Sequence, residues 1–478
     1  MSELRRSTAR GTLINAAFFV GITSLGLIKG FVVAGFLTRH QYGLWGLLIA
    51  SLSSIGLLKQ VGIEDQYVQQ QDADQELAFQ EAFTLELIFD VGFALLLAAV
   101  VPVLALAYGR PELLAPGFAL VLVVPALGFQ SPLWVFYRRM QFARQRRLGA
   151  IDPIIEFVVT VALAAAGAGY WSLVIGALVG NYIASIVIAV TSPYRLSWRF
   201  SRAAAKRYVR FSWPLFVAAL GGLVVTQGAV IVGTASVGLA GVGAIALASS
   251  IVSYTTQVDQ IVSTTLYPAI CAVRDRADLL LESFAKANRL GLLWGAPLGV
   301  GIALFASQLV RYGLGSHWRP AIGIIRAFGL IAAFDQVAYN WDDYFRARAE
   351  TRPIAVVSTI ATIAYVGVAL PLLIAYGLPG FEIGMAVSAV AGVGGRIAYL
   401  SRLFPTFAIV RHVVRAIVPT APAAAVVLAI RALGDSHGFG AVLAELVAYL
   451  ALVLATTVML ERPLLRELFG YLAPRPAT

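Results

Sequence analysis

The residues of this chain that could do chemistry are charged side chains within long apolar stretches. Lys29 lies near the middle of residues 12–37, an apolar run long enough to cross the ~30 Å hydrocarbon core of a bilayer as a helix. A charge at that depth costs roughly 2.5–3.5 kcal/mol on insertion scales, so Lys29, with Asn15 on the same helical face, is expected to face protein or water. Its ammonium could hold phosphate oxygens, or it could form a structural ion pair, for example with Asp90.

Carboxylates and a second lysine occupy positions from which they could act on an ion or close a pathway. Glu86 and Asp90 lie four residues apart, on one face of a predicted helix, and could carry protons or bind a coupling cation. The two carboxylates could equally neutralise Lys29 or Lys59. Lys59 and Asp259 occupy equivalent positions of the internal repeat described below, where opposite charges could form a gate on the inner side. Alternatively, each snorkels separately to the interface.

The composition indicates an integral membrane protein. The 478 residues are 59% hydrophobic and 13% charged, with a mean hydropathy of +0.81, whereas soluble domains carry about 25% charged residues. The single cysteine, Cys271, cannot form an internal disulfide and fits no metal-ligand spacing. No HExxH, CxxC, GxSxG or Walker A motif occurs, so we predict no enzyme, no cofactor and no metal site. The basic N-terminus precedes an apolar run too long for a signal peptide, which predicts a retained first helix.

Hydropathy, interrupted by Gly, Pro and charged residues, predicts an all-α polytopic protein with about fourteen transmembrane helices. The predicted spans are 12–37, 43–63, 79–107, 114–136, 151–168, 170–191, 209–235, 242–266, 290–310, 321–345, 354–376, 380–400, 413–431 and 438–460. Most Lys and Arg residues then fall in cytoplasmic segments, and the predicted outer loops hold only Arg39, Arg110, Arg311, Arg319 and Arg431. This asymmetry predicts that both termini are cytoplasmic. The net charge of +11 therefore reflects the membrane topology. It favours contact with anionic lipid headgroups rather than with nucleic acid.

The second half of the chain repeats the first at an offset of 200 residues. The identical pairs are Arg10/Arg210, Gly21/Gly221, Val32/Val232, Gly43/Gly243, Leu47/Leu247, Ser53/Ser253, Gln60/Gln260 and Tyr67/Tyr267. Each repeat holds six predicted spans, an even number, so both halves enter the membrane in the same orientation, related by a pseudo-two-fold axis along the membrane normal. We predict an N-terminal lobe at 1–207, a C-terminal lobe at 208–405, and two extra helices with a cytoplasmic tail at 406–478.

Several segments together resemble a known family of transporters. The stretch FLTRHQYGLWGLLIASLSSIGLLKQVGIEDQYVQQ resembles the segment that joins the first two helices of polysaccharide exporters in the multidrug/oligosaccharidyl-lipid/polysaccharide flippase superfamily. Further similar segments are Tyr108–Phe118, Gly169–Tyr182, Ser192–Phe216, Leu266–Asp275 and Gly315–Leu330. Their order and spacing match the family across roughly residues 10 to 405.

The resemblance implies two six-helix lobes around a central cavity that work by alternating access. It implies export of undecaprenyl-pyrophosphate-linked oligosaccharide across a bacterial inner membrane, for exopolysaccharide, capsule or O-antigen synthesis. In this interpretation Lys29 holds the pyrophosphate, Asn15 and Gln227 meet sugar hydroxyls, and Glu86 and Asp90 couple transport to protons or a cation. The family often has an acidic residue where this chain has Thr226-Gln227-Gly228. The implied partners are the lipid-linked substrate, anionic lipids, and polysaccharide polymerase and chain-length proteins.

Three alternatives differ in what they require of the sequence. An ion-coupled multidrug exporter of the same superfamily would favour carboxylates over a lysine at the centre of its cavity. A membrane polymerase or ligase of lipid-linked glycans needs a large outer loop with catalytic basic residues, which this chain lacks. A scaffold subunit without transport does not need an internal repeat. The sequence therefore favours a transporter.

Overall fold

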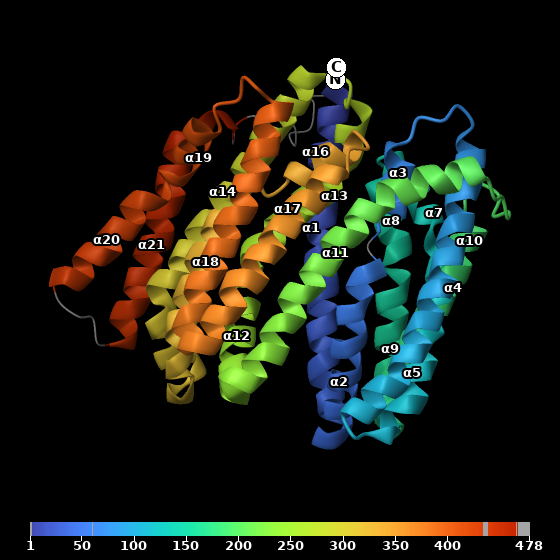
Figure 1. The fold of residues 1–478 in the computed structure, drawn as a ribbon, viewed down its shortest axis with the longest axis horizontal. Coiled ribbons are helices and arrows are strands. Elements are labelled where there is room, and N and C mark those ends of the chain that lie inside the picture. The colour runs from blue at the N-terminus through green and yellow to red at the C-terminus, as the bar shows by residue number, and fades with distance from the viewer. Residues whose placement is uncertain (1, 60, 434–437, 465, 467–478) are drawn as a thin grey trace, which may run out of the picture. The chain divides into compact units, whose positions relative to one another are not determined.

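The structure is a computed structural model that describes residues 2–59, 61–433, 438–464 and 466. The repeat position Gln60 and the predicted tail beyond residue 466 lie outside the described residues. All regular structure in the described part is helical, which confirms the predicted all-α class (Figure 1). The α-helices are α1 (Ser2–Ala34), α2 (Arg39–Gly56), α3 (Ile63–Gln69), α4 (Gln75–Ala107), α5 (Leu114–Val121), α6 (Val123–Leu127), α7 (Pro132–Arg138), α8 (Phe142–Gly149), α9 (Ile151–Ala165), α10 (Trp171–Val190), α11 (Arg202–Ser236), α12 (Gly238–Val252), α13 (Gln257–Ala272), α14 (Ala277–Gln308), α15 (Ile322–Asp335), α16 (Trp341–Ala347), α17 (Arg352–Ala364), α18 (Leu370–Leu403), α19 (Ile409–Ile417), α20 (Thr420–Leu433) and α21 (Phe439–Leu460).

The number of membrane spans differs from the predicted number. Eleven helical stretches in the described chain are long and apolar enough to cross a membrane, or twelve if the bent pair α19–α20 is one span, so the count of fourteen is not confirmed. Predicted spans 354–376 and 380–400 lie in one helical stretch, Arg352–Leu403, which is kinked at Gly377, where φ is 63°. Predicted span 321–345 contains two shorter helices, α15 and α16, separated by residues 336–340.

The chain forms two compact units, which we describe separately. Unit 1 is Met1–Ala219 with Arg346–Ala349, and unit 2 is Leu220–Phe345 with Glu350–Thr478. The division falls inside α11, so the first half of this helix belongs to unit 1 and the second half to unit 2. The predicted lobe boundary at 207/208 falls in the same helix.

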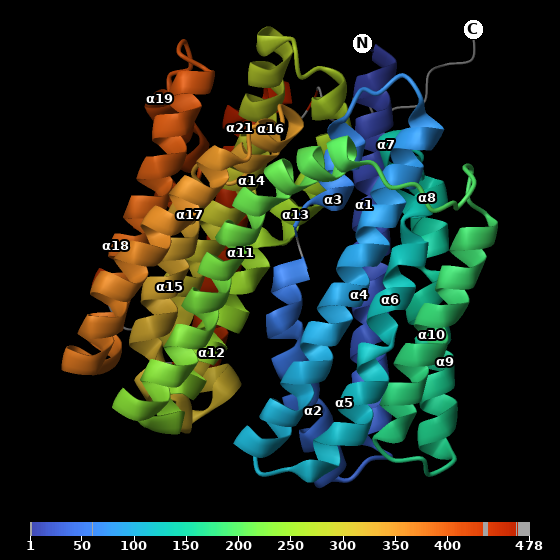
Figure 2. The same cartoon turned by 45° about the vertical axis from the view of Figure 1, so that its right-hand side comes forward.

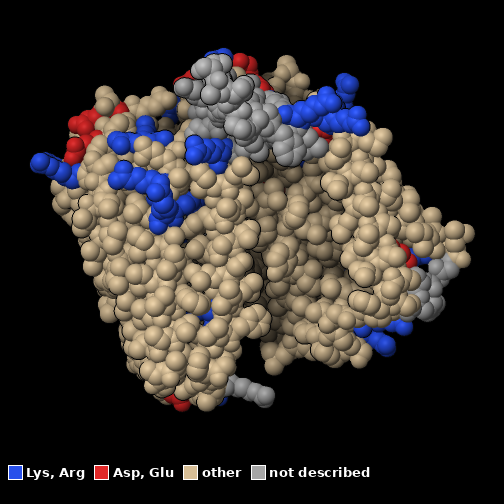
Figure 3. Space-filling model, turned by 180° about the vertical axis from the view of Figure 1, so that it is seen from behind, with Lys and Arg blue, Asp and Glu red and all other residues tan. Residues whose placement is uncertain are grey.

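The surface has the charge pattern of a multi-pass membrane protein. On the face shown in Figure 3, Lys and Arg gather near one end of the helices, and the sides of the helices between their ends are almost free of charge. Large apolar side chains are exposed along the helices, among them Phe31, Leu106 and Val190. Such a surface suits hydrocarbon rather than water.

In unit 1, α9 and α10 pack side by side because α10 has glycines where the two helices meet (Figure 2). A Cβ added at Gly176 would lie 1.9 Å from Thr160 Oγ1, and one at Gly180 would lie 2.9 Å from the carbonyl oxygen of Asp152. Small residues allow helix backbones to approach this closely. Helix α9 also packs against α1. The close contact with α10 therefore fixes the position of α9, and with it the distance between the polar face of α9 and α1.

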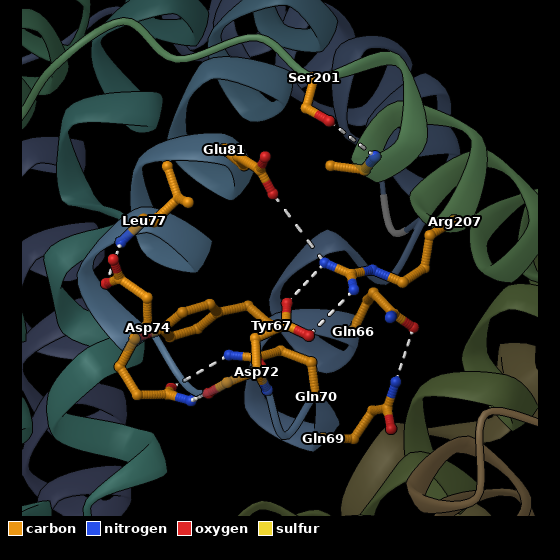
Figure 4. Close-up of polar contacts among 12 residues, drawn as sticks. Gln66, Tyr67, Gln69, Gln70, Asp72, Asp74, Leu77, Glu81, Ser201 and Arg207 are labelled. Atoms are coloured by element: carbon orange, nitrogen blue, oxygen red, sulfur yellow. Dashed lines mark hydrogen bonds and ion pairs between the residues drawn. The ribbon is translucent and has the colours of Figure 1, made fainter.

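Polar contacts tie the beginning of α11 to the rest of unit 1 (Figure 4). The Arg207 guanidinium donates to both carboxylate oxygens of Asp72, at 3.1 and 2.7 Å, and lies 4.0 Å from Glu81 on α4. The segment before α11 is also held on α4, because the Gln80 amide donates to the carbonyl of Arg195 at 3.2 Å. The first turns of α11 are therefore fixed in unit 1 by side-chain contacts as well as by the chain.

In unit 2, the two C-terminal helices pack on α14 through buried polar contacts. Arg431 of α20 donates to the carbonyl of Leu304 at 2.7 Å and pairs with Glu445 of α21 at 3.1 Å. The Tyr449 hydroxyl donates to the carbonyl of Pro297 at 2.7 Å. The predicted extra helices thus belong to the fold of unit 2.

We expect Gly180→Ala to destabilise unit 1. The added methyl would meet the backbone of Asp152, which cannot rotate away, so α9 and α10 must separate at a cost of about 1–3 kcal/mol. The measurement is the thermal unfolding midpoint of the detergent-purified protein. Gly92→Ala in α4 is the control, because nothing lies within 4 Å of a Cβ there and alanine favours a helix by about 1 kcal/mol. Equal stability of the two variants would contradict the packing described above.

Candidate functional site

The central lysine of α1 is paired with a carboxylate of α9. Lys29 Nζ lies 2.6 Å from Glu156 Oε1, and the two side chains are 22% and 21% exposed. The pair forms because α1 crosses the polar face of α9, which the glycines of α10 hold in place. Lys29 therefore has a counter-charge, as the ion-pair alternative expected, although its partner is Glu156 and not Asp90. About a fifth of the Lys29 side chain remains exposed.

A second cation lies along the same helix. Arg146 of α8 donates from Nε to Asn15 Oδ1 at 2.6 Å, and its guanidinium lies 5.1 Å from the ring centre of Phe18. Asn15 itself is buried. The positions of Asn15 and Lys29 are separated by about 21 Å along α1 at 1.5 Å per residue. Two cations of unit 1, Arg146 and Lys29, therefore lie along α1.

The second lysine lies between the two predicted coupling carboxylates. Lys59, at the end of a 3₁₀ turn (Leu57–Lys59), lies 2.8 Å from Asp90 Oδ1 and 3.4 Å from Glu86 Oε1. Asp90 is fully buried, and a Cβ at Gly128 would lie 3.0 Å from Asp90 Oδ2. The structure thus brings together the gate candidate Lys59 and both coupling candidates. One lysine therefore serves two carboxylates.

The two remaining predicted residues lie in unit 2. Gln227 is half-buried on α11, next to Gly228, which packs closely on Tyr365. Asp259 of α13 is buried beside Gln336. The gate between Lys59 and Asp259 stays a prediction, since the two residues belong to different units.

Sequence analysis missed the residues that complete these clusters. The sequence analysis proposed no role for Glu156, yet Glu156 pairs with Lys29 of α1. The signal that could have found it is the spacing of Asp152, Glu156 and Thr160, four residues apart on one face of an apolar helix. Gln336 carried no signal, because it is a single amide inside the predicted span 321–345.

Comparison with known families and curated proteins gives consistent matches. A family described as "Polysaccharide biosynthesis protein" matches residues 32–323, more than half of the chain. Lipopolysaccharide biosynthesis protein WzxC of Escherichia coli is 22% identical over 348 residues, which are 70% of this chain and 69% of WzxC. Succinoglycan biosynthesis transport protein ExoT of Rhizobium meliloti is 22% identical over 299 residues, which are 62% of this chain and 60% of ExoT.

Solved structures share the fold. An outward-facing multidrug resistance MATE family transporter of the MOP superfamily superposes with a TM-score of 0.71 at 16% identity, covering 84% of this chain and 96% of the other. A MOP superfamily transporter from Pyrococcus furiosus gives the same TM-score, identity and coverage. At this identity the match concerns the fold alone.

We expect Lys59→Met to destabilise the protein strongly. The substitution leaves the Asp90 carboxylate buried without its counter-charge, and breaking a buried ion pair from one side costs about 3–5 kcal/mol. The measurement is the thermal unfolding midpoint, with Lys206→Met as the control because Lys206 is exposed. If Asp90→Asn restores most of the stability that Lys59→Met loses, the cause is the unpaired charge. A Lys59→Met variant as stable as the control would show that the cluster does not hold α4 in place.

Proposed function

We propose that this chain, which belongs to the polysaccharide biosynthesis protein family, is a transporter of the MOP superfamily that flips a lipid-linked oligosaccharide across a bacterial inner membrane. The proposed substrate is a sugar unit on undecaprenyl pyrophosphate, moved from the cytoplasmic to the outer face by alternating access. The product would feed synthesis of a surface polysaccharide. In this proposal both chain termini are cytoplasmic, and a polymerase and chain-length proteins act on the exported units.

The Lys29–Glu156 pair is the observation that carries this proposal. A pyrophosphate brings more negative charge than one carboxylate, so it can take the Lys29 ammonium from Glu156 where the pair is partly exposed. Glu156 keeps the lysine charged and positioned when no substrate is bound. Release of the substrate on the far side would let the pair re-form.

The other predicted residues are assigned supporting roles. Gln227, half-buried on α11, is proposed to meet sugar hydroxyls. Asn15 already accepts a hydrogen bond from Arg146, so we propose that it positions this guanidinium near the substrate. Glu86 and Asp90, with one shared lysine, remain the proposed coupling carboxylates of unit 1.

We expect Lys29→Gln to reduce translocation by about 10- to 150-fold, the range that corresponds to losing one charged hydrogen bond of about 1.5–3 kcal/mol. The measurement is protein-dependent translocation of a fluorescent undecaprenyl-pyrophosphate-linked oligosaccharide in proteoliposomes. Lys206→Gln, an exposed lysine, is the control for the loss of a positive charge.

The double variant Lys29→Met with Glu156→Leu separates substrate binding from a structural role. It removes both charges, so neither is left unpaired. We therefore expect its thermal unfolding midpoint to be close to that of the wild type while its translocation stays low. If the double variant regains translocation, Lys29 is only a structural partner of Glu156. If the wild type moves no lipid-linked oligosaccharide but exports a cationic dye, the multidrug exporter alternative replaces the proposal.

A further inference from the structure

One membrane-spanning stretch of unit 2 exposes side chains that are polar but uncharged in its middle. The stretch Gly238–Ala272 consists of α12, the 3₁₀ turn Ser253–Thr256 and α13. Every exposed side chain among residues 249–264 carries a hydroxyl or an amide. Those spaced three or four residues apart lie along one side of the stretch, and with the adjacent Tyr254 we call them the α12–α13 face: Ser249, Ser253, Tyr254, Thr256, Gln260 and Thr264.

The α12–α13 face is poorly suited to contact with hydrocarbon. The hydroxyls of Ser253, Thr256 and Thr264 donate to backbone carbonyls three or four residues earlier, at 2.7–2.9 Å, which makes such residues tolerable in a membrane helix. Gln260 is exposed and Tyr254 is 63% exposed, so their amide and hydroxyl meet whatever surrounds the helices. Because polar groups without a partner are costly in hydrocarbon, this face needs water or a polar ligand.

A tryptophan lies beside the α12–α13 face. The indole of Trp294 donates from Nε1 to the carbonyl of Tyr254 at 3.2 Å. Trp294 lies midway along the helical stretch Ala277–Leu314 and is 44% exposed. Among residues 279–308, all of them described, it is the only side chain exposed by more than a third. Tryptophans of membrane proteins gather at the two interfaces, so an exposed indole at mid-span, in a helix that is otherwise covered, points to a ligand.

The neutral polar character of this face is specific to the second repeat. At the offset of 200 residues, Ser249 corresponds to Ile49 and Thr264 corresponds to Glu64. The first repeat thus has an apolar and a charged side chain where the second has two hydroxyls. The repeated fold therefore does not by itself require the hydroxyls of the second repeat.

We propose that the α12–α13 face and Trp294 bind neutral sugar residues of the transported oligosaccharide, an inference that rests on the proposed function. Hydroxyls and amides both donate and accept hydrogen bonds, so they match the hydroxyls of a sugar ring. The rings of Tyr254 and Trp294 can pack against the C–H face of a pyranose and still offer a polar group at their edge. An acidic sugar needs a cation at such a depth, whereas residues 238–272 contain no Lys, Arg or His and their one charged residue, Asp259, is buried.

The first test asks whether the face meets water or lipid. Ser253→Cys exchanges a single atom of an exposed side chain, and the native Cys271 is buried, so the unmodified chain gives the background. In nanodiscs we expect a membrane-impermeant maleimide to label Ser253→Cys at least about 10-fold faster than Leu450→Cys, because apolar surroundings suppress the reactive thiolate. Leu450 is the matched control, since it lies midway along α21 and is 57% exposed.

The second test is protection of Ser253→Cys from labelling by free tetrasaccharides of glucose, galactose and mannose, each compared with its C6-oxidised, acidic form. We expect saturable protection by at least one neutral tetrasaccharide and none by its acidic form. Adding Tyr254→Ala should raise the concentration for half-protection by about 2- to 12-fold, which corresponds to an aromatic contact of about 0.5–1.5 kcal/mol. Tyr254→Phe keeps the ring and should leave that concentration nearly unchanged. Tyr376→Ala is the control, because Tyr376 is a 70% exposed tyrosine of the same unit.

Four results would each overturn the inference. They are labelling of Ser253→Cys as slow as that of Leu450→Cys, no protection by any of the neutral tetrasaccharides, equal protection by the acidic forms, and equal effects of Tyr254→Ala and Tyr376→Ala. Neither test involves transport, so the inference and the proposed function can fail separately. Protection by neutral sugars in a chain that moves no lipid-linked oligosaccharide would contradict only the proposed function, and translocation without protection would contradict only the inference.

Discussion

Neutralising charge inside apolar helices is the constraint on which the rest of this structure depends. A charged side chain that leaves water needs a partner close by, because the surrounding hydrocarbon and protein screen its field weakly. The pairs that meet this need also join helices: Lys29 joins α1 to α9, Lys59 joins the turn after α2 to α4, and Arg431 joins α20 to α21. Glycines at the helix contacts then determine which of these partners come within reach.

The two units meet this constraint with different chemistry. In unit 1, lysines neutralise the carboxylates directly: Lys29 pairs with Glu156, and Lys59 lies against both Glu86 and Asp90. In unit 2, the buried carboxylate of Asp259 accepts a hydrogen bond from the Gln336 side chain.

The sequence was sufficient to predict the helical class and most of the membrane-spanning helices, because hydropathy depends on local composition. It was sufficient to predict the family because several segments resemble that family in order and spacing. It also offered Lys59 as one partner for Glu86 and Asp90, since carboxylates four residues apart share a helical face. The partner of Lys29 could not be predicted, because periodicity shows which face of a helix is polar but not which other helix packs against that face. The interruptions at residues 253–256 and 336–340 contain no Gly or Pro, so nothing local marks them. Tertiary contacts such as that between Gln336 and Thr255 accompany these breaks.

The division of α11 between the units bears on how this chain can evolve. In the internal repeat, Arg210 is the counterpart of Arg10, so the second copy begins near the start of α11. Yet the residues up to Ala219 belong to unit 1, and Arg207 is held there by Asp72. The start of the predicted second repeat is therefore held by contacts of unit 1. A genetic crossover between the codons for Asp72 and Arg207 would join contacts from two different parents, so recombination among relatives should preserve this interval as a block.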